Sequence, residues 1–418
     1  MHRTPVLLTS ADFYGTLASV RCFGRAGIPV TIATPDRLAP ASWSRYATSR
    51  VACPATDKTE EFVDWLIWFG KRSPRHALLA TSDDTAWQFS RYRSELERYF
   101  YLNQPSVDAI YGLLNKQRLD EHARQVGLDV PRAWFPRSDE ELERCGAEAE
   151  FPVLIKPTTQ VLFKTRGKGA MVARPNQLAA TYRSFGCLPY DASLIAFDSE
   201  AVRPMVQEFF PEAAQGIYNI SGFVDRGAIV GARAGRKLLQ WPRRIGVGVC
   251  FEEAPLCPVL LEGLTRLIRR VGFYGVFEAE FIVAGKRSML IDFNPRFYNQ
   301  MGFDIARGLP VPLLAYDAAV GDGSLRAALA GLVGAVLPGN RVFAHHGILQ
   351  LMLLAHRFCG GQSRGEIKAW KQWYERHRNG YTDAVLDDDD PMPARFDLLN
   401  RARSYLRYPR GFVRSFVG

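Results

Sequence analysis

The sequence predicts an α/β protein built from several domains, and three observations support this prediction. The chain opens with a strand–helix–strand pattern, two segments near residue 280 alternate with a period of two, and the chain beyond about residue 325 becomes helical, aromatic and basic. A length of 418 residues suffices for two or three domains, and 47% hydrophobic with 23% charged residues is ordinary for a globular protein.

Residues 1–112 are expected to form an open α/β domain around a parallel sheet. Short apolar runs predict buried strands, and segments of helical periodicity between them predict crossing helices. The predicted strands are PVLLTS (5–10), IPVTIAT (28–34) and HALLATS (76–82), and the predicted helices cover 16–26 and 59–70. Because no G-x-G-x-x-G motif follows the first strand, we do not expect a dinucleotide site.

Three further units are expected along the chain. Residues 113–206 are expected to form a linker helix (116–126) and a small lid. The predicted strands of the lid are FPVLIKP (151–157), AMVAR and PMVQEFF (204–210). Residues 207–325 predict a core with short strands, a helix near 258–271 and a hairpin, and residues 326–418 predict a helical, basic extension.

The predicted hairpin carries the most informative pattern. In FEAEFIV (277–283), Glu278 and Glu280 share one face of a strand, and in MLIDFN (289–294) so do Asp292 and Asn294. If the chain turns around Lys286, Glu280 lies opposite Asp292 with Asn294 one step away. Such oxygen donors suit Mg²⁺. The alternative is a half-exposed hairpin whose acids face water, although acids within so apolar a hairpin would be costly to bury.

These residues closely resemble the metal-binding element of the ATP-grasp superfamily, in which an acid is followed after about a dozen residues by acid-x-Asn-x-Arg. Here the matching residues are Glu280 and then Asp292-Phe293-Asn294-Pro295-Arg296. Other matching positions occur in the family's order: Lys116, Lys156 and the segment VQEFFP with Glu208, Phe209 and Phe210. The resemblance extends over most of residues 1–320 and implies an ATP-grasp fold with a pre-ATP-grasp domain, a lid and a nucleotide-binding core.

The resemblance also implies the chemistry and the roles of these residues. Lys116 and Lys156 would bind ATP phosphates, Glu208, Phe209 and Phe210 the adenine, and Glu280, Asp292 and Asn294 one or two Mg²⁺ ions, with Mn²⁺ as the alternative ion. Arg296 would hold a carboxylate or its acyl phosphate, because guanidinium binds such oxygens bidentately. A solvated helix residue is the alternative for Lys116, and a structural ion pair is the alternative for Arg296.

Two regions depart from the family pattern or leave choices open. The loop after Lys156, usually a run of glycines, contains two glycines and several cations: Lys164, Arg166, Gly167, Lys168 and Gly169. The ribose-binding residue is expected at Gln215, with Glu212 as the alternative. Basic candidates for contact with the triphosphate or substrate lie in RKLLQWPRRIGVG (236–248): Arg236, Lys237, Arg243 and Arg244. Arg244 joins Arg296 and Lys156 in the predicted catalytic set.

The expected reaction is ATP-dependent condensation of a small-molecule carboxylate with an amine, with one substrate resembling an amino acid or peptide. An ATP-grasp carboxylase, a catalytically silent nucleotide-binding regulatory protein and an enzyme acting on a membrane-linked acceptor are the alternatives. Asp83 and Asp84 line the substrate side or cap a helix, and the pair His345-His346 is interpreted as structural.

Charge and cysteine content set the remaining expectations. The net charge is +10, and six arginines lie in RFDLLNRARSYLRYPRGFVR near the C-terminus. They predict either a solvated helix face or a weak contact with anionic membrane or an acidic partner. No nucleic-acid partner is expected, and a homodimer is a further possibility. Seven scattered cysteines without C-x-x-C spacing and the lack of a secretory signal favour a reducing cytoplasm.

Overall fold

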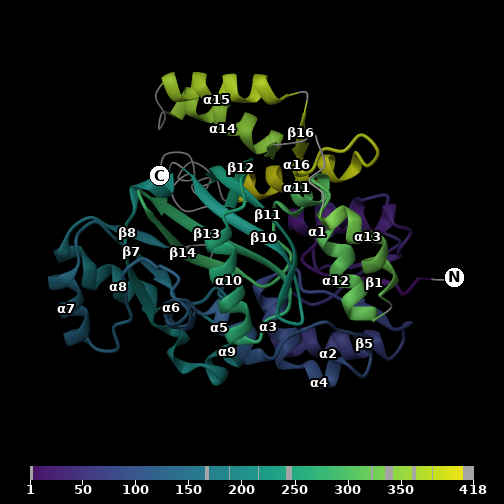
Figure 1. Cartoon of the computed structure of the whole chain (residues 1–418), viewed down its shortest axis with the longest axis horizontal. Coiled ribbons are helices and arrows are strands. Elements are labelled where there is room, and N and C mark those ends of the chain that lie inside the picture. The colour runs from purple at the N-terminus through teal and green to yellow at the C-terminus, as the bar shows by residue number, and fades with distance from the viewer. Residues whose placement is uncertain are drawn as a thin grey trace.

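A computed structural model describes residues 3–164, 169–187, 189–214, 216–241, 247–321, 323–334, 342–359, 364–378 and 380–407. Within these ranges the strands form three sheets of five, four and seven strands, which succeed one another along the chain as Figure 1 shows. The mixed α/β class predicted from the sequence is confirmed.

The N-terminal unit is the predicted open parallel sheet. Its strand order is β3-β2-β1-β4-β5, and all four pairings are parallel. The first strand, VLL, is fully buried because helices cover both faces of the sheet. The strands are β1 (Val6–Leu8), β2 (Val30–Ala33), β3 (Ser49–Val51), β4 (His76–Leu78) and β5 (Phe100–Tyr101); the helices are α1 (Tyr14–Arg25), η1 (Pro40–Trp43), α2 (Thr59–Gly70), α3 (Asp83–Arg91) and α4 (Arg93–Leu96).

A small antiparallel sheet with the order β6-β9-β7-β8 follows. It packs on α7 and α8 through a cluster of its own that includes Leu142, Ile155, Leu178 and Val206. The elements are α5 (Val107–Leu114), α6 (Lys116–Gln125), β6 (Ala133–Trp134), α7 (Asp139–Glu148), β7 (Val153–Pro157), β8 (Ala170–Val172), η2 (Pro175–Gln177), α8 (Leu178–Gly186), α9 (Ala192–Phe197), η3 (Ser199–Val202), β9 (Pro204–Glu208) and η4 (Pro211–Ala214).

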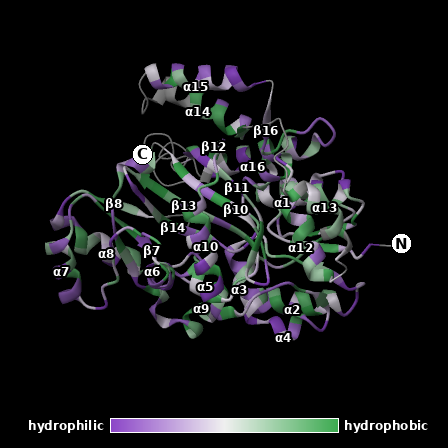
Figure 2. Cartoon of the chain, in the orientation of Figure 1, coloured by the Kyte–Doolittle hydropathy of each residue, from purple (hydrophilic) through white to green (hydrophobic). Residues whose placement is uncertain are grey.

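The third sheet has seven strands in the order β14-β13-β10-β11-β12-β15-β16. Its strands are β10 (Ile217–Asp225), β11 (Ala228–Trp241), β12 (Val247–Ala254), β13 (Gly275–Ala284), β14 (Arg287–Asn294), β15 (Val342–Ala344) and β16 (Tyr381–Asp383). Figure 2 shows β10 and β13 as largely hydrophobic, in keeping with their burial.

Helix α10 (Pro258–Val271) packs on one face of this sheet. It starts at a proline and stops before Gly272, whose φ of 69° is left-handed, so both ends follow the usual asymmetry of helix termini. Leu264 and Leu267 belong to one buried cluster with Phe277 and Phe281. The apolar side of the predicted hairpin therefore faces α10, which leaves Glu278 and Glu280 on the opposite face.

The C-terminal extension is mostly helical, as predicted, but it also adds two strands to the large sheet. Its helices are α14 (His346–Cys359), α15 (Arg364–His377) and α16 (Met392–Arg407), and they follow α11 (Met301–Ala306), α12 (Val311–Val320) and α13 (Ser324–Gly334). Strand β15 pairs with β12, and β16 pairs with β15. Three-residue strands carry too little alternation to be detected in a sequence.

The acidic run 387–390 contains a turn, and it contacts the N-terminal unit. Arg21 of α1 donates through Nε to Asp390 Oδ2 at 2.9 Å, with both side chains buried. The Ser44 hydroxyl donates to the same carboxylate oxygen at 2.7 Å. Helix α16 then packs against η1, where Phe396 stacks on Trp43 with ring centroids 3.8 Å apart. Helix α16, the last described helix, therefore packs against the N-terminal unit (Figure 1).

Candidate active site

The hairpin of β13 and β14 brings the predicted metal-binding acids together. Glu280 pairs with Asp292 and Glu278 with Asn294, so the predicted opposition is confirmed. A β-bulge sets this register: Phe281 pairs with Leu290, and Ile291 is the extra residue before Asp292. Without the bulge, Glu280 would face Ile291. The irregularity in the strand therefore aligns the two carboxylates.

Three lysines from three elements reach this polar face. Lys237 of β11 donates through Nζ to Glu280 Oε1 at 2.7 Å, and Lys116 at the start of α6 donates to Asp292 Oδ1 at 2.8 Å. Lys156 of β7 donates to Gln207 Oε1 at 2.8 Å. Burial, and next the charge of Lys116, lower the pKa of Lys156 to about 8, against the opposing charge of Asp292. The site is therefore rich in closely spaced positive charge.

Local capping places Lys116 at this site. Asn115 caps α6, because its side-chain oxygen accepts hydrogen bonds from the backbone N–H groups of Gln117 and Arg118. The backbone N–H of Lys116 donates to the carbonyl of Thr158 at 2.7 Å, just beyond β7. The strand that carries Lys156 and the helix that carries Lys116 are thus held together.

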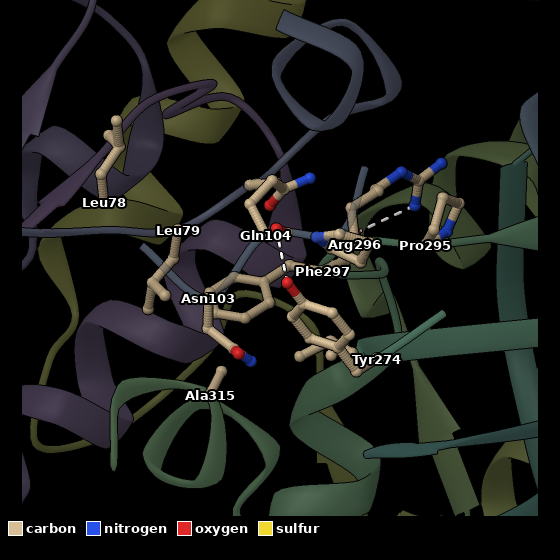
Figure 3. A pocket seen from close by; sticks show the side chains of 13 residues that line it. Leu78, Leu79, Asn103, Gln104, Tyr274, Pro295, Arg296, Phe297 and Ala315 are labelled. Carbon is tan, nitrogen blue, oxygen red and sulfur yellow. Dashed lines mark hydrogen bonds between the residues drawn. The ribbon is translucent and has the colours of Figure 1, made fainter. Parts of the chain in front are cut away.

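Arg296 follows the hairpin and joins it to the N-terminal unit. Its Nε donates to Asp83 Oδ1 and its Nη2 to Asn294 Oδ1, each at 2.8 Å. Figure 3 shows Arg296 beside a small pocket, where its Nη1 donates to the carbonyl of Phe297 at 3.0 Å. In the same pocket the Tyr274 hydroxyl donates to the Gln104 carbonyl at 2.8 Å. The three hydrogen bonds of Arg296 fix its guanidinium where the two units meet.

The two aspartates at the start of α3 have different contacts. Ser82, and neither aspartate, caps the helix, because its hydroxyl accepts from the Thr85 N–H in a capping box. Asp83 binds Arg296, whereas Asp84 accepts a hydrogen bond from the Leu162 N–H at 2.6 Å. Burial, and to a smaller extent the charge of Asp83, raise the pKa of Asp84 to about 7, against the opposing effect of the hydrogen bond from Leu162.

Glu278 is buried behind the paired acids. Asn294 Nδ2 donates to its Oε2 at 3.1 Å, and Gln300 donates to its Oε1. Burial, followed by the charge of Glu280, raises the pKa of Glu278 to about 7. Glu278 therefore orients the amide of Asn294, whose oxygen is turned toward Arg296.

The oxygen donors of the hairpin suit a hard cation. Glu280 and Asp292 contribute carboxylates, and Asn294 contributes an amide oxygen. Asn219 lies opposite Glu280 on β10, and its buried Oδ1 accepts no hydrogen bond from the described residues. Within the described ranges, however, no group of three or more His, Cys, Asp or Glu side chains is arranged to hold a metal. The two carboxylates are instead neutralised by Lys237 and Lys116.

The predicted adenine-binding segment lies at the end of β9. Glu208 exchanges backbone and side-chain hydrogen bonds with Arg132 beside β6: its N–H donates to the Arg132 carbonyl at 2.9 Å, and its Oε2 accepts from the Arg132 N–H at 3.2 Å. Arg287 lies 5.7 Å from the centre of the Phe210 ring. Phe209 is half-buried next to them. Gln215, Arg243 and Arg244, like Arg166 and Lys168, lie outside the described residues.

Sequence reasoning missed three polar residues of this site. Gln207, Asn219 and Gln300 are each buried and face a charged site residue or the paired acids. The available signal was a polar residue within a strongly apolar strand, as in PMVQE and IYNIS. Lys237 was one of four basic candidates, and the sequence alone does not separate it from Arg236.

This arrangement of a parallel N-terminal sheet, a small antiparallel sheet and a large, mostly antiparallel sheet is the ATP-grasp fold. Three solved structures illustrate the similarity. A biotin carboxylase from Campylobacter jejuni, in a β,γ-ATP complex, has a TM-score of 0.60 at 14% identity, over 77% of this chain and 72% of the other. An L-amino acid ligase from Bacillus licheniformis has a TM-score of 0.56 at 13% identity, over 76% and 75%.

The third structure is an N5-carboxyaminoimidazole synthetase from Staphylococcus aureus, with a TM-score of 0.56 at 11% identity over 76% of this chain and 78% of the other. No family model matches the chain, and no curated protein matches it by sequence. No described helix is both long enough and apolar enough to cross a membrane.

Proposed function

We propose that this chain is an ATP- and Mg²⁺-dependent ligase that activates a carboxylate as an acyl phosphate and condenses it with an amine. The observation that carries the proposal is the convergence of three lysines and two paired acids on one face of the core sheet, next to Arg296. The fold supports it, because all three structures described above are ATP-grasp enzymes.

The lysines are suited to bind a polyphosphate. Lys116, Lys156 and Lys237 repel one another, and that repulsion is relieved when phosphate oxygens lie between them. With a pKa of about 8, Lys156 is protonated at neutral pH and can donate to phosphate. In this structure Lys116 is paired with Asp292 and Lys237 with Glu280. Phosphates that bind the two lysines would free these carboxylates to bind a metal ion.

Glu280, Asp292 and the amide oxygen of Asn294 would hold Mg²⁺ or Mn²⁺, with the Asn219 oxygen as a further acceptor. A bound ion would screen the negative charge of the phosphates. Glu278 supports this set without joining it, since its two oxygens already accept from Asn294 and Gln300.

Arg296 would hold the reacting carboxylate. In the first step a carboxylate oxygen bonds to the γ-phosphorus, the bond to the β-bridging oxygen breaks, and ADP leaves. In the second step an amine nitrogen bonds to the acyl carbon, the acyl C–O bond breaks, phosphate leaves, and the nitrogen loses a proton. Guanidinium stabilises both the carboxylate and the spread charge of the transferring group.

An ATP-grasp carboxylase is the second candidate, favoured by the similarity to the biotin carboxylase structure. In that reaction bicarbonate takes the place of the carboxylate substrate. A silent nucleotide-binding protein is less well supported, because nucleotide binding alone does not require Arg296 beside the lysines.

The test measures ADP and phosphate release by the purified chain with Mg²⁺-ATP, against pools of carboxylic acids and amines and, separately, bicarbonate. Release that requires both pools supports the ligase, whereas release that requires bicarbonate identifies a carboxylase. We expect Glu280→Gln and Lys156→Met to lower turnover by at least about a hundredfold. The matched controls are Glu262→Gln on the outer side of α10 and Lys286→Met in the hairpin turn, both exposed. Equal loss in the controls, or no Mg²⁺-ATP binding by the wild type, would refute the proposal.

A further inference from the structure

A pocket of about 270 Å³ lies where the C-terminal extension meets the core sheet. Its described lining comes from three separate parts of the chain: Ala213 and Ala214 of η4, residues 237–240 of β11, and Trp370 of α15. Helix α15 lies outside residues 1–320, over which the chain resembles the ATP-grasp superfamily. The proposed function therefore makes no use of Trp370, although this residue lines a pocket of the core.

Lys237 connects the pocket to the candidate active site. It lines the pocket, and its Nζ donates to Glu280 Oε1 at 2.7 Å. The lining residues 213–214 lie in the sequence between the predicted adenine-binding segment 208–210 and the predicted ribose residue Gln215. A nucleotide that contacts both this segment and Lys237 would therefore pass beside the pocket.

Helix α15 is held against the core sheet by Trp373, which is buried. Its Nε1 donates to Glu252 Oε1 of β12 at 2.5 Å, and its side chain belongs to one cluster with Leu239 and Cys250. Trp370 is half-buried and packs against the same cluster, with its ring 5.5 Å from that of Trp373 at an interplanar angle of 65°. Figure 1 shows α15 beside the part of the core sheet that carries β12. Because its neighbours already restrain Trp370, a ligand that contacts it loses little affinity to side-chain ordering.

The lining combines a flat aromatic side chain with a cation. An indole ring stacks favourably on a planar base, and the ammonium group of Lys237 attracts phosphate. Glu212, the residue before Ala213, has a buried Oε2 that accepts no hydrogen bond from the described residues. A ribose hydroxyl is a donor of the kind that this oxygen lacks. One ligand that carries a planar ring, hydroxyl groups and phosphates would satisfy all three features.

We propose that Trp370 is part of the nucleotide site and that its indole ring contacts the nucleoside part of ATP. This inference rests on the proposed function, because Lys237 binds the phosphates of the same nucleotide. It gives the C-terminal extension a role in ATP binding, in addition to the strands β15 and β16 that the extension adds to the core sheet.

The test is a binding titration of the full chain with Mg²⁺ and a non-hydrolysable ATP analogue. We expect Trp370→Ala to weaken binding about tenfold, which is the size of one stacking contact. Trp370→Phe retains a planar ring and is expected to stay within about threefold of the wild type. The matched control is Trp68→Ala, which removes an exposed indole from α2 and is expected to leave binding unchanged.

Inorganic tripolyphosphate is the second probe, because it carries the charges of the nucleotide without base or ribose. Lys237→Met is expected to weaken its binding at least about tenfold, whereas Trp370→Ala is expected to leave it unchanged. This difference separates contact with the nucleoside from general damage to the extension.

The outcomes distinguish this inference from the proposed function. If the wild type does not bind the ATP analogue, the proposed function fails. If the wild type binds it, three results would overturn this inference alone: a Trp370→Ala variant that binds the analogue as tightly as the wild type, a Trp370→Phe variant as weak as Trp370→Ala, or an equal loss of tripolyphosphate binding in Trp370→Ala.

Discussion

Replacement of Lys156 by methionine is expected to stabilise the nucleotide-free protein while removing its function. The pKa of Lys156 is about 8 instead of 10.5, because its ammonium group is buried beside Lys116. At about 1.4 kcal/mol per pH unit, holding the charged form costs the folded state about 3 kcal/mol. The variant also loses the hydrogen bond to Gln207, which costs it about 1 kcal/mol, so its free energy of unfolding should rise by about 2 kcal/mol in total.

The stabilisation expected from Lys156→Met depends on pH and should disappear at high pH. Below pH 8 the lysine is protonated in both the folded and the unfolded state, so the full gain is expected at pH 7. Between pH 8 and 10.5 the unfolded chain binds more protons than the folded chain, so the wild type gains stability as the pH rises and the difference narrows. Above this window both states are neutral, and the electrostatic advantage of methionine is gone.

Denaturant unfolding of both proteins at pH 7 and at high pH measures this difference. Lys116→Met serves as the control, because that substitution removes the ammonium group that donates to Asp292 and is expected to give no gain. A Lys156→Met variant less stable than the wild type at pH 7, or a gain that is the same at every pH, would refute the reasoning.

Two further predictions concern packing between the units. Asp390→Ala leaves the buried guanidinium of Arg21 with only the more distant carboxylate of Asp387, 3.7 Å away, and is expected to lower the free energy of unfolding by about 3 kcal/mol. Exposed Asp388→Ala should change it by less than about 0.5 kcal/mol, and equal losses in denaturant unfolding would contradict this. A Cβ at Gly15 would lie 2.4 Å from the Tyr298 carbonyl oxygen, so Gly15→Ala should lower the melting temperature, whereas Gly331→Ala, in open space on a helix, should add about 0.5–1 kcal/mol; a stable Gly15→Ala variant would show that α1 can shift.

The sequence predicted the hairpin acids because alternation with a period of two is a local property. It did not predict the bulge at Ile291, since one extra residue in a strand leaves no local mark. The pairing of two lysines with these acids could not be predicted either. Lys237 and Glu280 are 43 residues apart, and only the sheet order shows that they meet. Burial of Gln207 and Asn219 likewise depends on which face of each strand is covered.

The C-terminal helix was the hardest element to interpret from sequence. Its arginines suggested a solvated face or an anionic surface, because charge density alone does not show where a helix packs. The contacts of Arg401 with Tyr14 and of Arg403 with Asp36 span nearly the whole chain. Contacts at such separation leave no periodic signal, so only the folded structure shows that the helix packs against the N-terminal unit.

The contact between Arg21 and Asp390 has a consequence for synthesis of the protein. The two residues are 369 positions apart, so at about 5–20 residues per second the carboxylate is made roughly 20–70 s after the arginine. During that interval the guanidinium and the edge of the first sheet lack the segment that covers them. A nascent chain that has already completed strands β10 to β14 therefore still lacks the helix that packs against η1, and the ribosome must finish α16 before that contact can form.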